Sequence, residues 1–390
     1  MAGLFKVCIE KIAAGGSGLA WIDGKTAFIE GSIPGETVIC RVSEDRRTWF
    51  QAELLEILEP SPDRVQPVCA LWGICGGCNV QHISYPAQLA AKKAILTEAF
   101  YRIGGFSPPE PFIIPSDPWE YRNRMQFHAV RQHKKEEQTA WGLKARKKGD
   151  IIPVSDCPIA DPGIRSVLQV QSADTKTTSQ LIPPGKDRFS VYARKGLFLS
   201  EGAEKRGKTQ ILDRDLILDT RVFFQSNGAM LEKLITDLRE IVKSADYSQP
   251  MADLYCGVGT YAAFLGERFP QIDLVEENKT ALSLANENLR GKPASFYAQR
   301  SEQWAKSGIP SHYGFIIADP PRQGFEPSLS RRLAAEGPPL LAYVSCDPAT
   351  LARDSAILLK GGYELTELRL YDFYPQTAHI ESLALFVRLK

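Results

Sequence analysis

The stretch Met251-Ala-Asp-Leu-Tyr-Cys-Gly-Val-Gly259-Thr260 decides the fold of this chain. Its apolar first half predicts a buried strand, Gly257 and Gly259 predict a tight turn, and the residues after Thr260 predict a helix. Glycines let a ligand approach the backbone, and a helix N-terminus offers free N–H groups. The stretch therefore predicts a ligand-binding β–α turn, and a purely structural turn is the alternative reading.

The residues from about 221 onward alternate apolar strands with helical stretches. This pattern is typical of a parallel sheet wrapped by helices, the doubly wound α/β fold. A second strand, Ile272–Val275, ends in Glu276, which is placed to accept hydrogen bonds from ribose hydroxyls. The dinucleotide fingerprint is incomplete, because position 262 is Ala and Asp253 precedes the turn. That carboxylate would repel a pyrophosphate but not a sulfonium, so the turn favours S-adenosylmethionine over NAD.

Two further strand ends carry polar groups. Phe315–Ala318 is followed by Asp319-Pro-Pro-Arg322-Gln-Gly324, and a strand beginning at Leu340 is followed by Ser345-Cys346-Asp347. Ligands of open α/β sheets bind outside the carboxyl ends of the strands, so we expect both loops to face one cleft. Cys346 precedes a predicted helix, whose N-terminus would favour the thiolate. Inert packing is the commoner role of a buried cysteine.

The 390 residues are long enough for two or three domains. We predict a small β unit over 1–59, a central domain over 60–220 and the α/β domain over 221–390. Short alternating runs with glycine-rich turns make the first unit resemble an oligonucleotide-binding barrel, with half a sandwich as the alternative. A helix is predicted from Tyr85 to Ile103, with an apolar face formed by Leu89, Leu96, Phe100 and Ile103.

The chain has eight cysteines, and four of them form a candidate ligand set. These are Cys69, Cys75, Cys78 and the more distant Cys157. Four thiolates can hold zinc or a [4Fe–4S] cluster. Zinc ribbons usually pair two Cys-x2-Cys knuckles, and the second is absent. Gly76 and Gly77 leave N–H groups that can point at sulfur, which favours the iron–sulfur cluster modestly. A thioredoxin-like pair is disfavoured, because no βαβ pattern surrounds it.

Composition excludes several classes of protein. The chain is 44% hydrophobic and 24% charged, which is ordinary for a globular protein, and it has no apolar run long enough for a membrane helix. Glu10 and Lys11 interrupt the apolar start that a signal peptide needs. We therefore expect a cytoplasmic protein without a membrane partner, acting as a monomer. The net charge is only +1, so nucleic-acid binding would depend on the basic runs at 131–135 and 144–148.

Five motifs, in order and spacing, resemble the RNA uracil-C5 methyltransferase family over nearly the whole chain. They are Phe223–Asn227, Asp253–Gly259, Asp319–Gly324, Tyr343–Thr350 and His379–Leu385. The resemblance implies a class I, Rossmann-like methyltransferase domain that uses S-adenosylmethionine. The first unit looks like the TRAM domain of this family, and the cysteine stretch looks like its iron–sulfur motif. The resemblance thus makes a [4Fe–4S] cluster the expected ligand of the four cysteines.

The resemblance also implies roles for single residues. Cys346 would add to C6 of the uracil, and Glu381 would remove the C5 proton. Asp319 and Gln225 would hold the uracil edge and the methionine end of the cofactor. Residues placed at the cofactor nucleoside are Tyr255, Thr260 and Glu276.

Three positions depart from the family or have no single reading. Asp347 stands where Asn is usual, which preserves a hydrogen bond and adds a charge beside the thiol. Arg300 stands where Asn or Asp would contact the adenine, so that contact is unassigned. Arg322 fits a loop-stabilising contact, a phosphate contact or a structural salt bridge equally well.

The substrate implied by the family is RNA, whose target base must flip out to reach Cys346. The TRAM-like unit and the cysteines favour 23S ribosomal RNA, and transfer RNA is the alternative. A second class of function is a catalytically silent RNA-binding or assembly protein, but such a scaffold would not need Cys346, Glu381, Asp319 and Gln225 together. A radical or redox iron–sulfur enzyme would need a Cys-x3-Cys-x2-Cys motif or a flavin site, and neither is present.

Overall fold

The computed structural model describes residues 3–131, 139–146, 149–171, 181–183, 185–307 and 312–389. It divides into two compact units. The first unit comprises Met1–Leu96, Lys144–Asp150 and Tyr374–His379, and the second comprises the rest of the chain. The division at 59 and 220 stays a prediction. Most of the basic run at 131–135, and residues 147–148 of the second run, lie outside the described residues.

The first unit is built on a six-stranded sheet in the order β1-β5-β6-β4-β3-β2. The strands are β1 (Leu4–Cys8), β2 (Lys11–Ile12), β3 (Gly18–Ile22), β4 (Lys25–Glu30), β5 (Thr37–Asp45) and β6 (Trp49–Glu59). Alternate residues such as Ala20, Ala27 and Val38 are buried in one core, which takes residues from β1, β3, β4, β5 and β6. The predicted β unit is therefore present, with the short β2 in addition.

Helix α1 (Tyr85–Ala99) follows the cysteine stretch and continues into a π-helical turn, Phe100–Gly104. The wider π turn rotates the residues after Phe100 relative to the α-helical period. Phe100 is buried as predicted, whereas Ile103 is exposed, so its predicted place on the apolar face is wrong.

Residues 374–379 are held within the first unit by backbone hydrogen bonds. The Gln376 N–H donates to Gln88 Oε1 at 3.0 Å, and the Gln376 carbonyl accepts the N–H groups of Asn79 and Val80, both at 3.2 Å. The Ala378 N–H donates to Asn79 Oδ1 at 2.8 Å. This segment therefore packs on residues some 290 positions earlier in the chain.

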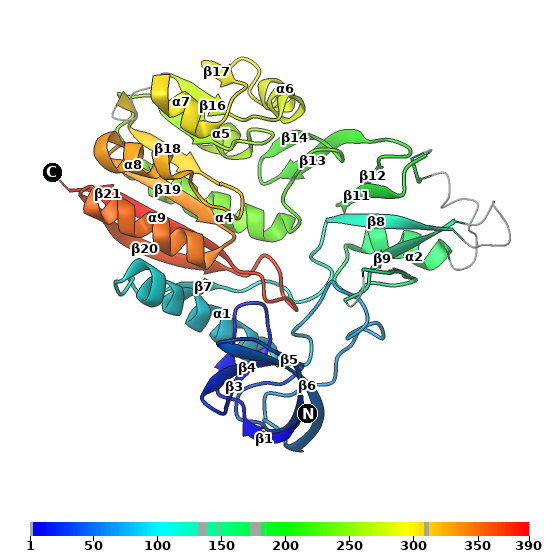
Figure 1. The fold of residues 1–390 in the computed structure, drawn as a ribbon. Coiled ribbons are helices and arrows are strands. Elements are labelled where there is room, and N and C mark those ends of the chain that lie inside the picture. The colour runs from blue at the N-terminus through cyan, green and yellow to red at the C-terminus, as the bar shows by residue number, and fades with distance from the viewer. Residues whose placement is uncertain are drawn as a thin grey trace. The chain divides into compact units, whose positions relative to one another are not determined.

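An eight-stranded sheet forms the core of the second unit (Figure 1), in the order β17-β16-β15-β18-β19-β21-β20-β7. Its strands are β7 (Phe112–Ile114), β15 (Met251–Leu254), β16 (Ile272–Val275), β17 (Ala294–Tyr297), β18 (Phe315–Ala318), β19 (Leu340–Ser345), β20 (Tyr363–Tyr371) and β21 (Glu381–Arg388). The first five strands of that order are parallel, and β21 runs antiparallel to both of its neighbours. The predicted doubly wound α/β domain is confirmed, and β7 joins it from outside the predicted boundary.

Two smaller sheets complete the second unit. One has the order β10-β9-β8-β11-β12, and the other pairs β13 with β14. The strands are β8 (Arg124–Arg131), β9 (Thr139–Lys144), β10 (Ile151–Pro153), β11 (Arg188–Arg194), β12 (Leu197–Ser200), β13 (Arg206–Ile211) and β14 (Arg214–Asp219). Aromatic packing of Phe127, Trp141 and Phe189 fills the core of the larger of these sheets.

The remaining helices cover the sheets of the second unit. They are α2 (Pro162–Gln171), α4 (Gly228–Ile241), α5 (Thr260–Leu265), α6 (Lys279–Asn288), α7 (Ser301–Ser307), α8 (Pro327–Glu336) and α9 (Pro348–Lys360). Within the described ranges, every helix is too short or too polar to cross a membrane.

The turn between β15 and α5 has the strained backbone that its sequence predicts. Tyr255, Gly257 and Gly259 have positive φ angles of 60°, 54° and 77°. A Cβ at Gly259 would lie 2.8 Å from Leu289 Cδ1 and 3.0 Å from Ala285 Cβ, whereas a Cβ at Gly257 would meet no protein atom within 4 Å. Gly259 therefore allows α5 to pack closely, and Gly257 leaves its backbone open to a ligand.

Substitution of the two glycines separates these roles. Gly259→Ala should lower the free energy of unfolding by about 1–3 kcal/mol more than Gly257→Ala, because both carry backbone strain but only the first adds a steric clash. Urea unfolding of both variants measures the difference. Equal decreases in the free energy of unfolding would show that a Cβ at position 259 causes no steric clash with Leu289 and Ala285.

Candidate active site

Asp253 lies at the end of β15 and is completely buried. Its Oδ2 accepts the N–H of Ala262 at 3.0 Å, within the first turn of α5. Burial, with smaller contributions from the Asp319 and Glu276 carboxylates, raises the pKa of Asp253 to about 8. The group is therefore largely uncharged at neutral pH. Our expectation that its charge would repel a pyrophosphate is therefore wrong. The sequence motif could not show this, because it does not show how deeply the carboxyl group is buried.

Glu276 follows β16 and binds the glycine turn. Its Oε2 accepts the Gly257 N–H at 3.2 Å, and its Oε1 accepts the Asn278 N–H at 2.7 Å. Thr260 is the first residue of α5, and Tyr255 directly follows β15. The structure thus brings the three predicted nucleoside contacts to one turn, while their role toward a cofactor stays a prediction.

Asp319 follows β18 and is bound by two side chains. Tyr261 donates its hydroxyl to Asp319 Oδ2 at 3.0 Å, and Gln225 Nε2 approaches the same oxygen at 3.4 Å. Burial raises the pKa of Asp319 to about 6, against the lowering effect of these two hydrogen bonds. Gln225 Oε1 is buried and has no hydrogen-bond partner in the described part of the chain. It can therefore accept a hydrogen bond from a ligand, which fits the ammonium group of S-adenosylmethionine.

Tyr261 was not among the predicted site residues. It stands one residue inside α5 and is buried, so its sequence position resembles that of an ordinary core residue. Only the side-chain contact with Asp319 shows its place in the site.

Cys346 and Glu381 lie at the adjoining ends of neighbouring strands. Ser345 is the last residue of β19 and pairs with Ser382 of β21 in antiparallel register. The next pair outward from this one is Cys346 and Glu381, because antiparallel register runs in opposite directions on the two strands. The structure thus brings together the two residues predicted to carry the reaction.

The electrostatic environment of this pair is acidic with one nearby cation. Burial, followed by the carboxylates of Glu381 and Asp319, raises the pKa of Cys346 to about 12. Burial and Asp319 likewise raise the pKa of Glu381 well above its ordinary value. Arg322, on the loop after β18, acts in the opposite direction and lowers the pKa of both groups. Asp319 and Arg322 therefore both act on Cys346 and Glu381 at one edge of the sheet.

The expected thiolate at Cys346 is not supported by this environment, and that prediction is wrong for the protein without substrate. Asp347 is the N-cap of α9, and its Oδ1 accepts the Thr350 N–H at 2.9 Å. Cys346 lies one residue before that cap, outside the first turn of the helix. Burial and two carboxylates therefore outweigh the helix terminus. The cap also accounts for Asp347 itself, because Asp and Asn cap helices equally well.

Arg300 is exposed and forms an ion pair with Glu277 at 3.1 Å. This contact occupies its guanidinium at the protein surface, so the adenine contact stays unassigned. The ion pair is solvent-exposed on both sides and contributes little to stability.

The cysteine stretch of the first unit is fixed by backbone contacts. The Gly76 N–H donates to the Lys144 carbonyl at 2.9 Å, and Arg146 Nη2 donates to the Cys78 carbonyl at 2.6 Å. The Gly77 N–H points at Cys75 Sγ at 3.4 Å, as the glycine pattern predicts.

The four predicted metal ligands are divided between the two units. They are Cys69, Cys75 and Cys78 of the first unit and Cys157 of the second, and none is in a disulfide. Among the described residues, no three His, Cys, Asp or Glu side chains are close enough together to bind a metal. The thiols and the Gly77 N–H fit an iron–sulfur ligand set in their chemistry, and the ligand set stays a prediction.

Comparisons with known proteins agree with this geometry. Residues 232–341 match the model of the methyltransferase small domain, and residues 310–389 match that of tRNA (uracil-5-)-methyltransferase. The crystal structure of Pyrococcus abyssi tRNA (uracil-54, C5)-methyltransferase in complex with S-adenosyl-L-homocysteine superposes with a TM-score of 0.77 at 23% identity, covering 98% of this chain and 100% of that one. The fold is that of an S-adenosylmethionine-dependent methyltransferase.

Two relatives show which family of methyltransferases the chain resembles. An uncharacterized RNA methyltransferase of Treponema denticola is 32% identical over 97% of both chains. The 23S rRNA (uracil(1939)-C(5))-methyltransferase RlmD of Pseudomonas fluorescens is 31% identical over 98% of this chain and 93% of its own. This chain belongs to the RNA uracil-C5 methyltransferase family.

The buried Asp253 predicts a pH-dependent stability. Its folded-state pKa of about 8 lies above its ordinary value of 3.8, so the unfolded chain releases the proton at lower pH. The contribution of protonated Asp253 to the free energy of unfolding is complete below about pH 4 and is lost as the pH rises to about 8. Asp253→Asn keeps an acceptor for the Ala262 N–H, and because Asn does not ionise, its stability does not fall with pH for this reason.

The difference in unfolding free energy between variant and wild type should therefore shift in favour of Asp253→Asn by up to about 1.4 kcal/mol per pH unit in this range. Urea unfolding of both proteins without cofactor at several pH values measures it. A difference that stays constant with pH would mean that Asp253 is ionised in the folded protein.

Proposed function

We propose that this enzyme methylates C5 of a uridine in ribosomal RNA through a covalent bond between Cys346 and C6 of the uracil. The observation that carries the proposal is the position of Cys346 and Glu381 at the adjoining ends of β19 and β21, with Asp319 and Arg322 on the loop that follows the neighbouring β18. A nucleophile, a base and a charge that stabilises anions are the groups that this reaction requires.

Cys346 acts first: as the thiolate it forms a bond from sulfur to C6, and the electron pair of the C5–C6 double bond moves to C5 and O4 as an enolate. The free protein holds Cys346 as a thiol, because burial and carboxylates raise its pKa to about 12. Arg322 favours the thiolate, since its positive charge lowers that pKa. The same charge would stabilise the developing enolate oxygen.

Glu381 acts last, by removing the C5 proton so that the bond between Cys346 sulfur and C6 can break. Burial and Asp319 raise the pKa of Glu381, and Arg322 lowers it, so this cation favours the carboxylate form that accepts the C5 proton. The base is thus adjacent to the nucleophile and shares the cation with it.

S-adenosylmethionine supplies the methyl group as an electrophile when it is bound. Gln225, with its buried unpaired oxygen, and Asp319 would hold its methionine end or the uracil edge. At the nucleoside we propose Tyr255, Thr260 and Glu276, which meet at the glycine turn. The open backbone at Gly257 supports this placement.

The choice of ribosomal RNA is supported by the RlmD relatives, which resemble this chain over nearly its full length. We propose that the N-terminal sheet is a TRAM-like unit that helps to bind the RNA, and that the target base is flipped out. Transfer RNA is the alternative substrate, for which the Pyrococcus abyssi structure offers only a similarity of fold. A silent scaffold is disfavoured, because it would not need an acidic site with a buried unpaired amide oxygen.

We also propose that Cys69, Cys75, Cys78 and Cys157 bind a [4Fe–4S] cluster. The support is that none of the four cysteines is in a disulfide and that the Gly77 N–H is directed at Cys75 Sγ. When bound, the cluster would supply folding energy and a rigid surface, and it has no part in the methyl transfer.

The order of the two catalytic residues can be tested on denaturing gels with target RNA and cofactor. Cys346→Ala should form no covalent complex, because the sulfur that adds to C6 is missing. Glu381→Gln should accumulate the RNA–protein complex, because a base needed only for elimination does not block addition or methyl transfer.

Wild-type enzyme with RNA that contains 5-fluorouridine is the matched control, since fluorine cannot leave as a cation and the same complex is trapped. Normal turnover by Glu381→Gln, or a shifted band with Cys346→Ala, would show that these roles are assigned wrongly.

The proposed cluster predicts the metal content of the protein. Protein purified without oxygen should be brown and contain about four iron atoms per chain. Cys78→Ser should lose iron and stability more than methyl-transfer chemistry, because cluster binding is coupled to folding. Cys8→Ser is the control, because Cys8 is an exposed free cysteine outside the ligand set. One zinc per chain with no visible absorption would refute the cluster.

A further inference from the structure

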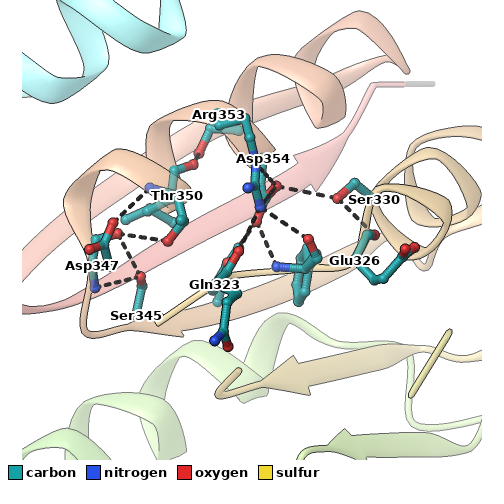
Figure 2. A network of polar contacts seen from close by, with 12 residues as sticks. Gln323, Glu326, Ser330, Ser345, Asp347, Thr350, Arg353 and Asp354 are labelled. Carbon is teal, nitrogen blue, oxygen red and sulfur yellow. Dashed lines mark hydrogen bonds and ion pairs between the residues drawn. The ribbon is translucent and has the colours of Figure 1, made fainter. Parts of the chain in front are cut away.

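Helix α9 begins two residues after Cys346 and binds the backbone of the loop that follows β18 (Figure 2). We call residues Asp319–Phe325 the 319–325 loop. Thr350, Arg353 and Asp354 are spaced by three and four residues, so they share one face of α9. All three direct polar atoms at this loop.

The contacts are made to main-chain atoms of the loop. Thr350 Oγ1 donates to the Arg322 carbonyl at 3.2 Å. Arg353 Nη2 donates to the carbonyls of Gln323 and Phe325 at 2.9 and 3.0 Å. Because the partners are backbone carbonyls, these contacts hold the course of the loop whatever its exposed side chains do.

Asp354 is the buried centre of this network. Its Oδ2 accepts the Phe325 N–H at 2.8 Å and the Tyr343 hydroxyl at 2.9 Å. Its Oδ1 accepts Arg353 Nε at 2.9 Å and the Ser330 hydroxyl of α8 at 3.3 Å. A buried carboxylate is costly unless it is fully hydrogen-bonded, and these four donors satisfy it from the loop, the sheet and both helices.

Gly324 shows how closely the loop approaches the carboxylate. A Cβ at this position would lie 2.6 Å from Asp354 Oδ2, and the φ angle of 71° also favours glycine. The rings of Phe325 and Tyr343 stack at 4.2 Å between centroids and fix the end of the loop on β19. The loop is therefore held at its turn and at its end.

The same loop carries two of the charged groups that act on the pKa of Cys346. These are Asp319 and Arg322, and the third is Glu381 of β21. Arg322 lies in the exposed part of the loop, so its position depends on the backbone that α9 holds. The network thus connects the helix that follows the nucleophile to the loop that carries the cation.

We propose that Asp354, together with Thr350 and Arg353, is a positioning residue that holds Arg322 beside Cys346 through the backbone of the 319–325 loop. The inference rests on the proposed function, in which Cys346 is the nucleophile. In this proposal Asp354 does not contact the substrate and affects Cys346 only through the position of Arg322.

The rate at which iodoacetamide alkylates Cys346 tests the proposal, because only the thiolate reacts. It is measured by mass spectrometry of the Cys346 peptide at fixed pH, without RNA or cofactor. Arg322→Gln should slow alkylation, and Asp354→Asn and Thr350→Val should slow it by about threefold, equivalent to half a unit in the apparent pKa. In the Arg322→Gln background, neither substitution should have a further effect.

A slower alkylation of Cys346 cannot be explained by the lost charge of Asp354 or by a loosened loop. Removing the negative charge of Asp354 would by itself favour the thiolate and speed alkylation, and a loosened loop would speed it by better access. Ser330→Ala is the matched control, because it removes an Asp354 contact that does not reach the loop, and it should leave the rate unchanged.

Faster or unchanged alkylation in Asp354→Asn and Thr350→Val would overturn the proposal, as would an equal slowing in the Arg322→Gln background. Thr350→Val carries the test if Asp354→Asn does not fold. Because the assay uses neither RNA nor S-adenosylmethionine, absence of methylation by the wild type would refute the proposed function and leave this result intact.

Discussion

The burial of several carboxyl groups at one edge of the parallel sheet is the constraint on which the site depends. Asp253 and Glu381 are buried, Asp319 is partly buried, and the pKa values of all three are raised. The raised pKa of Cys346 follows from the same crowding. Each group must therefore be compensated by hydrogen bonds or by the charge of Arg322, which makes the position of every donor important.

Much of this arrangement could be predicted from the sequence. Asp319 and Cys346 follow neighbouring parallel strands, and such strand ends meet at one edge of a sheet. The spacing of the motifs indicated the family as well. The protonation states could not be predicted, because the expected thiolate at Cys346 and the expected charge of Asp253 depend on burial and on distances to other carboxyls. Tyr261 was missed for a similar reason, since only a side-chain contact places it in the site.

The segments that sequence periodicity did not predict are those whose pairing partners lie far away in the sequence. Strand β7 pairs with β20 across more than 250 residues, and residues 374–379 pack on Asn79 and Gln88. A local pattern contains no information about such pairings. The turn of π-helix after α1 similarly moved Ile103 from the predicted apolar face to the surface.

The contact between Gly324 and Asp354 has a consequence for how this sequence can change over evolution. The two positions lie 30 residues apart in the chain, yet any side chain at the first would overlap the carboxylate of the second. A larger residue at position 324 becomes acceptable only after position 354 has been shortened, and a shortened residue there leaves the Phe325 N–H without its acceptor. Single substitutions at either position are therefore unfavourable, and exchange at both positions requires a third mutation that restores the lost hydrogen bond.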